Sequence, residues 1–363
     1  MDKRPQKMIK LALQGGGSHG AFTWGVLDQL LEDERIRIEA VSGTSAGAMN
    51  AVALADGMAR GGPGEARKSL EKFWSATSTA AQYSPIRRSI VDVFMGNWSL
   101  DTSPVYILMD HLSRIFSPYD LNLLDYNPLR DVVAACVDFD RVNDQAGIKL
   151  FLTATNVRTG RPKVFRRPAI TLDCVMASAC LPFLFKAVEI DGEAYWDGGY
   201  MGNPALFPLV DECEAGDLVL IQINPFYRPD VPRSARDIQN RLNEITFNAA
   251  LLKELRSLAF LWEIIHHENL ERERYRDARV HAIHDEATML GLGVSSKVNA
   301  EWAFLTYLRD QGRKATQDWL SEHYDDLGVR NTLSLAWIFD ESLRPAHLPE
   351  DADREYSIRA LAR

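Results

Sequence analysis

Short apolar runs separated by helix-like stretches dominate the first eighty residues of this chain. The runs at 8–14 and 38–42 have the length of buried strands. The stretches at 46–59 and 65–77 are helix-like, and so is the stretch between the two runs, with apolar side chains at Phe22, Val26, Leu27, Leu30 and Leu31. Strands and helices that alternate at this spacing predict a parallel sheet with helices on both of its faces.

The pattern becomes less regular later and changes its character near Ser234. Further strand-like segments lie at 148–155, 163–165, 188–190, 194–196 and 218–223. From Ser234, with Asp237 three residues further on as a helix-start signal, we expect a long helix with more than one apolar stripe. A strand-like segment at 279–284 and an amphipathic helix at 297–320 follow it.

These patterns divide the chain into an α/β domain over 1–232 and a mainly helical C-terminal extension over 233–363. Within the first region, the segment 89–119 carries large apolar side chains among turn residues such as Gly96 and Pro104. An amphipathic lid over an apolar site has this composition, and so does an ordinary insertion that covers the core. The sequence leaves both interpretations open.

Composition narrows the classes of partner. The net charge of the 363-residue chain is −9, whereas nucleic-acid-binding proteins normally carry a basic surface, so we expect no nucleic-acid partner. This charge gives no general attraction to an anionic membrane but leaves transient contact with a membrane surface open, and a homo-oligomer is open too. The four cysteines lack metal-ligand spacing, and no signal-peptide core or membrane-length apolar run is seen. We therefore expect a cytoplasmic protein.

The most informative motif is Gly-Thr-Ser-Ala-Gly at 43–47, which places Ser45 between a predicted strand and a predicted helix. This order is typical of a nucleophile elbow, a strained turn that exposes a serine hydroxyl. Gly43 and Gly47 suit such a turn because neighbouring segments must pass close to it. The amides at the start of the next helix would face an oxyanion formed at the serine. The motif therefore predicts acyl transfer through Ser45.

A glycine loop about thirty residues upstream supports this interpretation. Gly15, Gly16 and Gly17 follow the first predicted strand, and bare backbone of this kind can present N–H groups closely to a substrate oxygen. Because the carboxyl ends of parallel strands meet at one edge of a sheet, we expect this loop to lie beside Ser45.

The candidate base lies far downstream. Asp197 follows a short predicted strand and precedes Gly198 and Gly199. Taken alone, an Asp-Gly pair is more typical of a plain hairpin turn. Together with the serine motif and the glycine loop, it becomes a candidate to accept the proton of Ser45.

Four segments in this order resemble the patatin-like phospholipases: Gly-Gly-Gly-Ser-His-Gly at 15–20, Gly-Thr-Ser-Ala-Gly at 43–47, Ala-Ser-Ala-Cys-Leu-Pro at 177–182 and Asp-Gly-Gly at 197–199. The resemblance covers roughly 7–224. It implies a three-layer α/β/α fold with a mostly parallel central sheet, and a serine–aspartate dyad that needs no histidine, metal or other cofactor. It makes Ser45 the nucleophile, Asp197 the base, and the amides of Gly15, Gly16 and Gly17 the oxyanion hole.

The resemblance also gives supporting places in these turns to Gly20, Gly43, Gly47, Gly198 and Gly199. The chain departs from the family at His19, where an arginine or lysine is usual. A neutral imidazole would put less positive charge near a substrate phosphate or an oxyanion, so the head-group preference is left open.

These features together predict a serine acyl hydrolase of lipid esters. Two alternatives keep the same fold: hydrolysis of another ester, such as a thioester or a storage polyester, or a lipid-binding module without catalysis. The positions of Gly15, Gly17 and Gly20 also fit a dinucleotide-binding fingerprint, but the acid expected at the end of the second strand is missing.

A further alternative is an α/β-hydrolase triad of Ser45, Asp197 and either His281 or His284. The nucleophile of that fold normally follows several strands, whereas Ser45 follows the second predicted strand. Neither histidine is expected to bind a metal.

Overall fold

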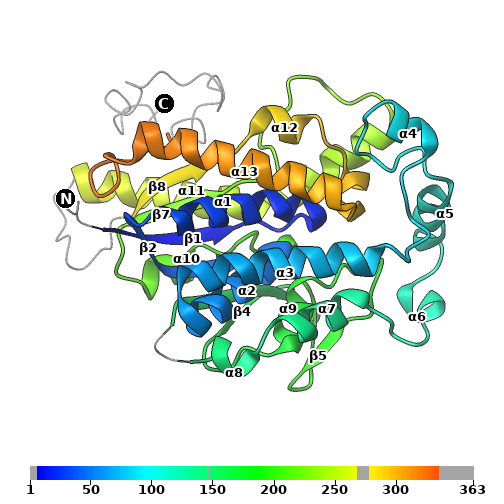
Figure 1. Cartoon of the computed structure of the whole chain (residues 1–363), viewed down its shortest axis with the longest axis horizontal. Coiled ribbons are helices and arrows are strands. Elements are labelled where there is room, and N and C mark those ends of the chain that lie inside the picture. Colours follow the sequence, from blue (N-terminus) through cyan, green and yellow to red (C-terminus); the bar gives the residue numbers. More distant parts are fainter. Residues whose placement is uncertain (1–5, 145–146, 268–277, 335–363) are drawn as a thin grey trace.

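The computed structural model describes residues 6–144, 147–267 and 278–334, which form an eight-stranded sheet covered by helices on both faces (Figure 1). The strands lie in the order β5-β6-β3-β2-β1-β7-β8, and β4 pairs with β3 outside this path. Their bounds are β1 Lys7–Leu13, β2 Ile36–Gly43, β3 Lys149–Asn156, β4 Pro162–Arg166, β5 Val188–Ile190, β6 Glu193–Asp197, β7 Asp217–Ile221 and β8 Arg279–Ile283.

The centre of the sheet is parallel, as the alternating pattern predicts. Strands β3, β2, β1, β7 and β8 run in one direction, whereas β4, β5 and β6 form antiparallel pairs. The apolar runs are continuous because both faces of the parallel strands are buried. In β1, for example, Leu11 and Leu13 join one core cluster, and Ala12 joins the cluster on the other face.

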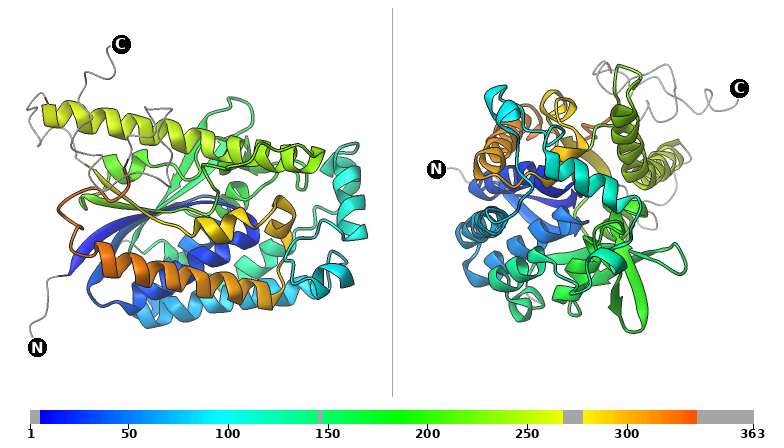
Figure 2. Two further views of the ribbon diagram at one scale, coloured as in Figure 1. Left: turned by 90° about the horizontal axis from the view of Figure 1, so that it is seen from above. Right: turned by 90° about the vertical axis from the view of Figure 1, so that its right-hand side faces the viewer.

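Two helical layers enclose the sheet (Figures 1 and 2). One layer contains α1 Gly20–Glu32, α2 Ala46–Gly61, α3 Pro63–Ala81, α7 Pro128–Cys136, α8 Phe139–Val142, α9 Leu172–Ser178 and α13 Trp302–His323. The opposite layer contains α10 Phe207–Asp211 and the long helix α11 Ala235–His267. Between these elements, the described part of the chain forms the 3₁₀ turns η1 Gly17–His19, η2 Gly198–Tyr200 and η3 Val294–Val298. The short helix α12 Glu286–Leu290 precedes η3.

Residues beyond 232 contribute to both the sheet and a helical layer. Strand β8 extends the sheet by pairing in parallel with β7. Helix α13 packs so closely on α1 that a methyl group on Gly25 would lie 1.9 Å from the Arg309 carbonyl oxygen, and one on Gly312 would lie 2.1 Å from that of Phe22. The boundary at residue 232 therefore stays a prediction, while the extension shares its core with the rest of the chain.

The predicted helix at 297–320 is wrong at its start. Residues Val294–Val298 form η3, and α13 begins only at Trp302. The Asn299 side chain accepts the N–H of Glu301 at 3.0 Å, and such local side-chain bonds compete with helical ones. The apolar spacing alone could not reveal this break, which leaves Lys297 in η3 rather than in the predicted helix.

Helices α4 Ile90–Phe94, α5 Pro104–Ser113 and α6 Pro118–Leu121 lie together at one end of the molecule (Figures 1 and 2). The Leu100 N–H donates to Ser295 Oγ at 3.0 Å, and Asn299 Nδ2 donates to the Trp98 carbonyl at 3.0 Å. The segment therefore contacts η3, which in turn packs on η1 after β1. Its role as a lid stays a prediction. Among the described helices, we find none with the length and apolar character required to cross a membrane.

Candidate active site

Ser45 lies in a strained turn between β2 and α2. Its backbone angles are φ 55° and ψ −121°, a region that non-glycine residues rarely occupy. The Ser45 N–H donates to Ser178 Oγ at 3.0 Å, and Met49 N–H donates to the Ser45 carbonyl at 3.1 Å. The turn therefore has the form predicted for a nucleophile elbow, at the N-terminal, positive end of a sixteen-residue helix.

The glycine loop lies directly against this turn. A methyl group on Gly15 would lie 2.7 Å from Ser45 Cβ, and one on Gly47 would lie 2.3 Å from the Leu13 carbonyl oxygen. Only glycine permits this approach, because any Cβ would displace the neighbouring chain. The other two motif glycines of this region, Gly20 and Gly43, are equally tight against the backbone or Cβ of residues 46–48.

The three loop amides differ in their hydrogen bonding. The Gly15 N–H donates to Asn203 Oδ1 at 2.6 Å and is therefore already used. The N–H groups of Gly16 and Gly17 have no acceptor among the residues that the structure describes. Gly17 has a positive φ of 59°, and its backbone lies on the Lys297 carbonyl. Two adjacent amides, which follow Gly15 in the loop, thus remain without an acceptor among the described residues.

Sheet register brings Asp197 to the same edge. Strand β6 runs antiparallel to β3 and pairs Asp197 with Ala154, while β2 pairs Gly43 with Leu152 of the same β3 strand. The ends of β6 and β2 therefore lie on either side of β3, at positions only two residues apart along that strand. The Asp197 main chain is fixed there, since its N–H donates to the Cys180 carbonyl at 2.8 Å and its carbonyl accepts from Thr155 Oγ1 at 2.9 Å.

The Asp197 carboxyl is completely buried. Its Oδ1 accepts the Gly199 N–H at 2.7 Å, and its Oδ2 has no fully formed hydrogen bond among the described residues. Burial raises the pKa of Asp197 to about 6, against the lowering effects of Gly199 N–H, the Ser45 side chain and the charge of Lys297. The Ser45 side chain thus lies close enough to lower the pKa of this carboxyl, although Oδ2 accepts no hydrogen bond among the described residues. Such contacts are often long without substrate.

The turn after Asp197 is as crowded as the serine turn. A methyl group on Gly198 would lie 2.1 Å from the Thr153 carbonyl oxygen, and one on Gly199 would lie 2.3 Å from the Phe247 ring. The Ser178 hydroxyl donates to the same Thr153 carbonyl at 2.6 Å, which ties the serine turn to β3. The predicted alternative of a plain hairpin turn does not fit, because the chain continues into η2 rather than into a paired strand.

Three residues at this site were missed by the motif analysis. Asn203 binds the glycine loop, Ser178 binds the serine turn, and Lys297 lies against Gly17. Ser178 belongs to the 177–182 motif, whose position could have suggested contact with the site. Asn203 and Lys297 carried no sequence signal, because each is brought in by a loop or a 3₁₀ turn.

His19 is buried and neutral. Its Nε2 lies 2.8 Å from Ser296 Oγ, and the Ser296 hydroxyl is 2.7 Å from the Gly293 carbonyl, to which it donates. The imidazole must then be the donor to Ser296. Burial and the charge of Lys297 lower the pKa of His19 to about 3. His19 therefore supplies no positive charge to the site.

The structure separates the two other histidines from Ser45. His281 Nε2 pairs with Asp217 Oδ1 at 3.0 Å, and His281 Nδ1 lies 3.0 Å from Thr332 Oγ1. His284 follows β8 and lines a small hollow beside Asn224, and neither histidine contacts Ser45 or Asp197. The triad alternative is therefore wrong. Within the described ranges, no group of three or more His, Cys, Asp or Glu side chains is arranged to hold a metal.

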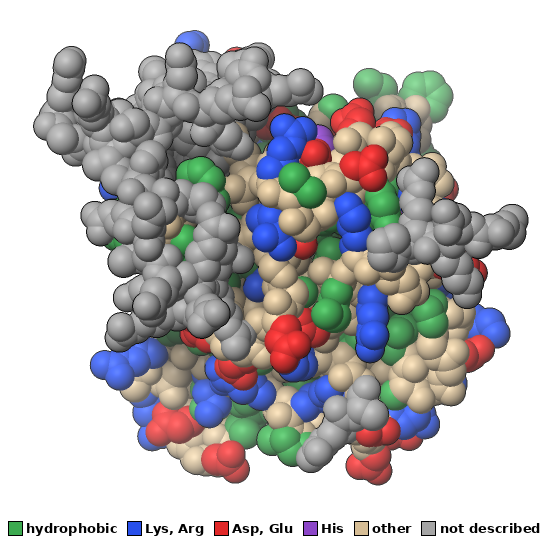
Figure 3. Space-filling view, turned by 90° about the vertical axis from the view of Figure 1, so that its left-hand side faces the viewer, with side chains coloured by type: hydrophobic (Ala, Val, Ile, Leu, Met, Phe, Trp, Pro, Cys, Tyr) green, Lys and Arg blue, Asp and Glu red, His purple; other side chains and the backbone are tan. Residues whose placement is uncertain are grey.

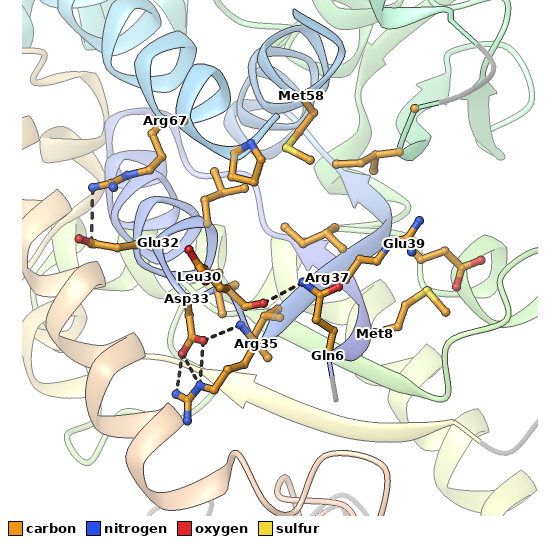
Figure 4. A pocket seen from close by; sticks show the side chains of 18 of the residues that line it. Gln6, Met8, Leu30, Glu32, Asp33, Arg35, Arg37, Glu39, Met58 and Arg67 are labelled. Atoms are coloured by element: carbon orange, nitrogen blue, oxygen red, sulfur yellow. Dashed lines mark hydrogen bonds and ion pairs between the residues drawn. The ribbon is translucent and has the colours of Figure 1, made fainter. Parts of the chain in front are cut away.

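A wide hollow lies at the opposite edge of the sheet (Figure 4). It is formed where β1 and β2 begin and α1 ends, and its charged side chains pair with one another, as Arg35 does with Asp33 and Arg67 with Glu32. Ser45 lies at the other end of β2. This hollow is therefore separate from the site.

A family model described as patatin-like phospholipase matches residues 11–210, more than half of the chain. The chain belongs to the patatin-like phospholipase family. Its three-layer arrangement and mostly parallel sheet are the patatin fold, and its family supports a hydrolase that acts on lipid esters. The fold that the four motifs imply is thereby confirmed.

Individual relatives of this patatin-like chain are distant. It is 28% identical over 198 residues to the uncharacterized protein YjjU of Escherichia coli (strain K12). The matched stretch covers 53% of this chain and 45% of that protein. The chain thus matches less than half the length of this relative. Among solved structures, VipD from Legionella pneumophila gives a TM-score of 0.33 at 16% identity over 85% of this chain and 67% of that one. A chain of the ExoU–SpcU complex from the type III secretion system of Pseudomonas aeruginosa gives a TM-score of 0.30 at 19% identity. That match covers 90% of this chain and 63% of the other one.

Proposed function

We propose that this patatin-like chain is a serine acyl hydrolase of lipid esters that works through Ser45 and Asp197. The observation that carries the proposal is the pairing of a serine on a strained turn with a buried carboxyl whose pKa the serine side chain helps to lower. A carboxylate with a pKa near 6 is a competent general base at neutral pH.

Each step uses groups of this chain. Asp197 accepts the proton of Ser45 as the serine Oγ attacks the ester carbonyl carbon, and the carbonyl oxygen becomes an oxyanion. The C–O bond to the alcohol then breaks, and Asp197 returns the proton to the leaving alcohol. In the second half, Asp197 takes a proton from water as the water oxygen attacks the acyl carbon. The bond between that carbon and Ser45 Oγ then breaks, and Asp197 returns the proton to Oγ, which releases the acid and restores both residues.

The oxyanion hole is proposed for the amides of Gly16 and Gly17, with the positive end of α2 behind them. The N–H of Gly15 is left out of this proposed oxyanion hole, because it already donates to Asn203 Oδ1. Gly15 is instead proposed to support the loop. Asn203 thereby fixes the backbone of the loop and directs the next two N–H groups.

Gly16→Val tests this hole. The only tight contact of a Cβ at Gly16 would be with the flexible end of Ile223, at 2.8 Å, while His19 Cβ would lie at an ordinary 3.8 Å. The fold can therefore adapt, while the added side chain hinders close approach of the carbonyl oxygen. We expect kcat to fall by about 10²- to 10³-fold, the usual effect of losing an oxyanion donor. Turnover at the wild-type rate, in a variant with an unchanged melting temperature, would count against the proposed hole.

The substrate is proposed to come from a lipid surface. The apolar rim, which we define as Ile90, Phe94, Leu123 and Leu124, exposes between 75% and 93% of each side chain. The rim lies in the part of the chain that carries α4, α5 and α6, which contacts η3 through the bond from the Leu100 N–H to Ser295 Oγ. On its other side, Lys186 Nζ, from the loop after Pro182, donates to the Leu123 carbonyl at 3.2 Å. Exposed apolar surface of this kind beside a lipid hydrolase site favours contact with lipid.

The opposite end of the molecule has a different surface. Figure 3 shows charged side chains of both signs scattered among polar and small apolar areas there. An apolar rim at one end and a mixed charged surface at the other fit an enzyme that meets its substrate with the end that carries α4, α5 and α6.

Phe94→Asp and Leu124→Asp are each expected to weaken binding to phosphatidylcholine vesicles by about tenfold or more. The reason is that burying a large apolar side chain contributes about 1.5–3 kcal/mol. Co-sedimentation with vesicles measures this. Val329→Asp is the matched control, because Val329 is 73% exposed and follows α13 near the opposite edge of the sheet. Vesicle binding of the Phe94 and Leu124 variants equal to that of the Val329 variant would contradict a role for the rim.

A panel of p-nitrophenyl esters, thioesters, phospholipids and a polyester, run with wild type and Ser45→Ala, tests the function itself. We expect phospholipid or neutral lipid ester turnover that depends on Ser45. Preference for a thioester or polyester would select the alternative hydrolase, and binding of lipid without turnover would select the lipid-binding module. The cytoplasmic location and the oligomeric state stay predictions.

A further inference from the structure

Lys297 brings an unpaired positive charge to the glycine loop. It lies on η3, and its carbonyl oxygen would be 2.3 Å from a methyl group on Gly17. Its ammonium group donates to Asn224 Oδ1 at 2.9 Å and to Asn243 Oδ1 at 3.1 Å. No carboxylate lies within ion-pair distance of it among the described residues.

A hydrogen-bond chain links this ammonium to the proposed oxyanion hole. Asn224 accepts from Lys297 with its oxygen and donates from Nδ2 to the Gly15 carbonyl at 2.8 Å. Asn243 lies on α11, the helix that also contacts the Asp197 turn through Phe247. Two neutral amides therefore hold Lys297 at the loop without cancelling its charge.

The ammonium has one donor left. A lysine carries three N–H donors, and two are taken by the asparagine oxygens. The ammonium also lies 5.7 Å from the centre of the Phe247 ring, and no third oxygen or nitrogen acceptor is found in the described part of the chain. Burial lowers the pKa of Lys297 to about 8, so it remains mostly charged at neutral pH. The charge reaches the site, because it lowers the pKa values of both Asp197 and His19.

We propose that Lys297 is a substrate-binding cation whose remaining N–H binds the phosphate of a lipid ester while the ester carbonyl lies at the glycine loop. The inference rests on the proposed function and assigns a substrate-binding role to a residue outside the region that matches the family, for esters that carry a phosphate. His19 cannot serve this purpose, because it is neutral and its Nε2 is bound to Ser296. Lysine is suited to phosphate as a compact point charge.

Binding without turnover tests the inference independently of the proposed reaction. The probe is dihexanoyl phosphatidic acid, kept below its micelle concentration and titrated calorimetrically into Ser45→Ala. We expect about ten- to hundredfold weaker binding to Ser45→Ala/Lys297→Met, since hydrogen bonds to charged groups contribute on that scale. Lys297→Arg in the same background should retain most of the affinity.

Three controls make the result specific. Lys314→Met removes a lysine whose side chain is 71% exposed on α13, and it should bind like Ser45→Ala alone. Lys297→Met should weaken the binding of dihexanoylglycerol, which lacks the phosphate, much less than it weakens the binding of phosphatidic acid. Inorganic phosphate should bind at least tenfold more weakly than phosphatidic acid, and equal affinity would overturn the assignment to a lipid. Melting temperatures confirm that each variant folds.

A pH profile separates a binding charge from a structural side chain. Of the other groups around Asp197, Cys180 and Tyr200 have pKa values raised to about 12 and His19 one lowered to about 3, so all are neutral near pH 6. Beyond Lys297, Glu244 and Arg228 pair with each other. Removing the Lys297 charge should therefore raise the pKa of Asp197 and move the acid limb of kcat/KM for a soluble ester to higher pH.

Equal affinity of phosphatidic acid for the Ser45→Ala and Ser45→Ala/Lys297→Met proteins overturns the inference, and so does an acid limb that stays in place in Lys297→Met. If wild type hydrolyses no ester at all, the proposed function fails, and the binding comparison still decides the role of Lys297.

Discussion

Ser45→Ala is expected to remove nearly all hydrolysis, with kcat falling by up to about 10⁶-fold, as found when a serine nucleophile is deleted. The reason is the covalent step: without Oγ no acyl-enzyme forms, and only the glycine loop and binding remain to assist water. Hydrolysis of a p-nitrophenyl ester measures the loss.

The variant should remain folded, because alanine keeps the backbone N–H that Ser178 binds. It should melt no lower than wild type, since φ 55° at position 45 is equally costly for serine and alanine. Ser178→Ala is a useful comparison: it keeps the nucleophile but removes the support of the turn, and we expect a partial loss. A Ser45→Ala protein with more than a few per cent of wild-type kcat would contradict Ser45 as the nucleophile.

Asp197→Asn is expected to lower kcat by about 10²- to 10⁴-fold, the range attributed to a positioned general base. Asparagine has the same shape and can still accept the Gly199 N–H, but it cannot take the proton of Ser45. Wild-type activity should rise with pH as Asp197 ionises, with a midpoint near its pKa of about 6. The residual activity of Asp197→Asn should not show this rise with pH.

The same substitution should increase stability in a defined pH window. Because burial raises the pKa of Asp197 from 3.8 to about 6, its ionised form costs the folded state about 3 kcal/mol. Below about pH 4 the carboxyl is neutral in both states and this cost is absent, whereas above about pH 6 it is fully present. Urea unfolding should therefore show Asp197→Asn to be more stable than wild type above pH 6, with the difference vanishing near pH 4. A loss of stability at high pH would show that burial does not dominate.

The sequence predicted the parts of the fold that local patterns encode. Continuous apolar runs mark β1 and β2 because both faces of these strands are buried, and the glycines at 43 and 47 mark the serine turn because no other residue fits there. The order of strands and helices then led to a parallel sheet. The four motifs led to the family, which the match over residues 11–210 confirms.

Other features arise only from the folded chain. The side-chain acceptor of Gly15 is Asn203, and the charge beside the loop belongs to Lys297, which lies nearly three hundred residues from the glycine loop in sequence. Neither residue belongs to a motif or to an apolar stripe. Lys297 was hidden further, because the apolar spacing placed it on a helix that begins only at Trp302. Strand β8 shows the same limit, since its pairing with β7 depends on long-range register.

Covalent labelling of Ser45 is the most direct test of the Ser45–Asp197 pair. Wild type is treated with a fluorophosphonate over a range of pH, and the modified peptide is identified by mass spectrometry. We expect a single phosphonylated residue, Ser45, with a labelling rate that rises through about pH 6, and labelling of Asp197→Asn that is slower and loses this pH dependence. Labelling of Ser45 at the same rate and with the same pH profile in Asp197→Asn, or labelling at another residue, would contradict the dyad.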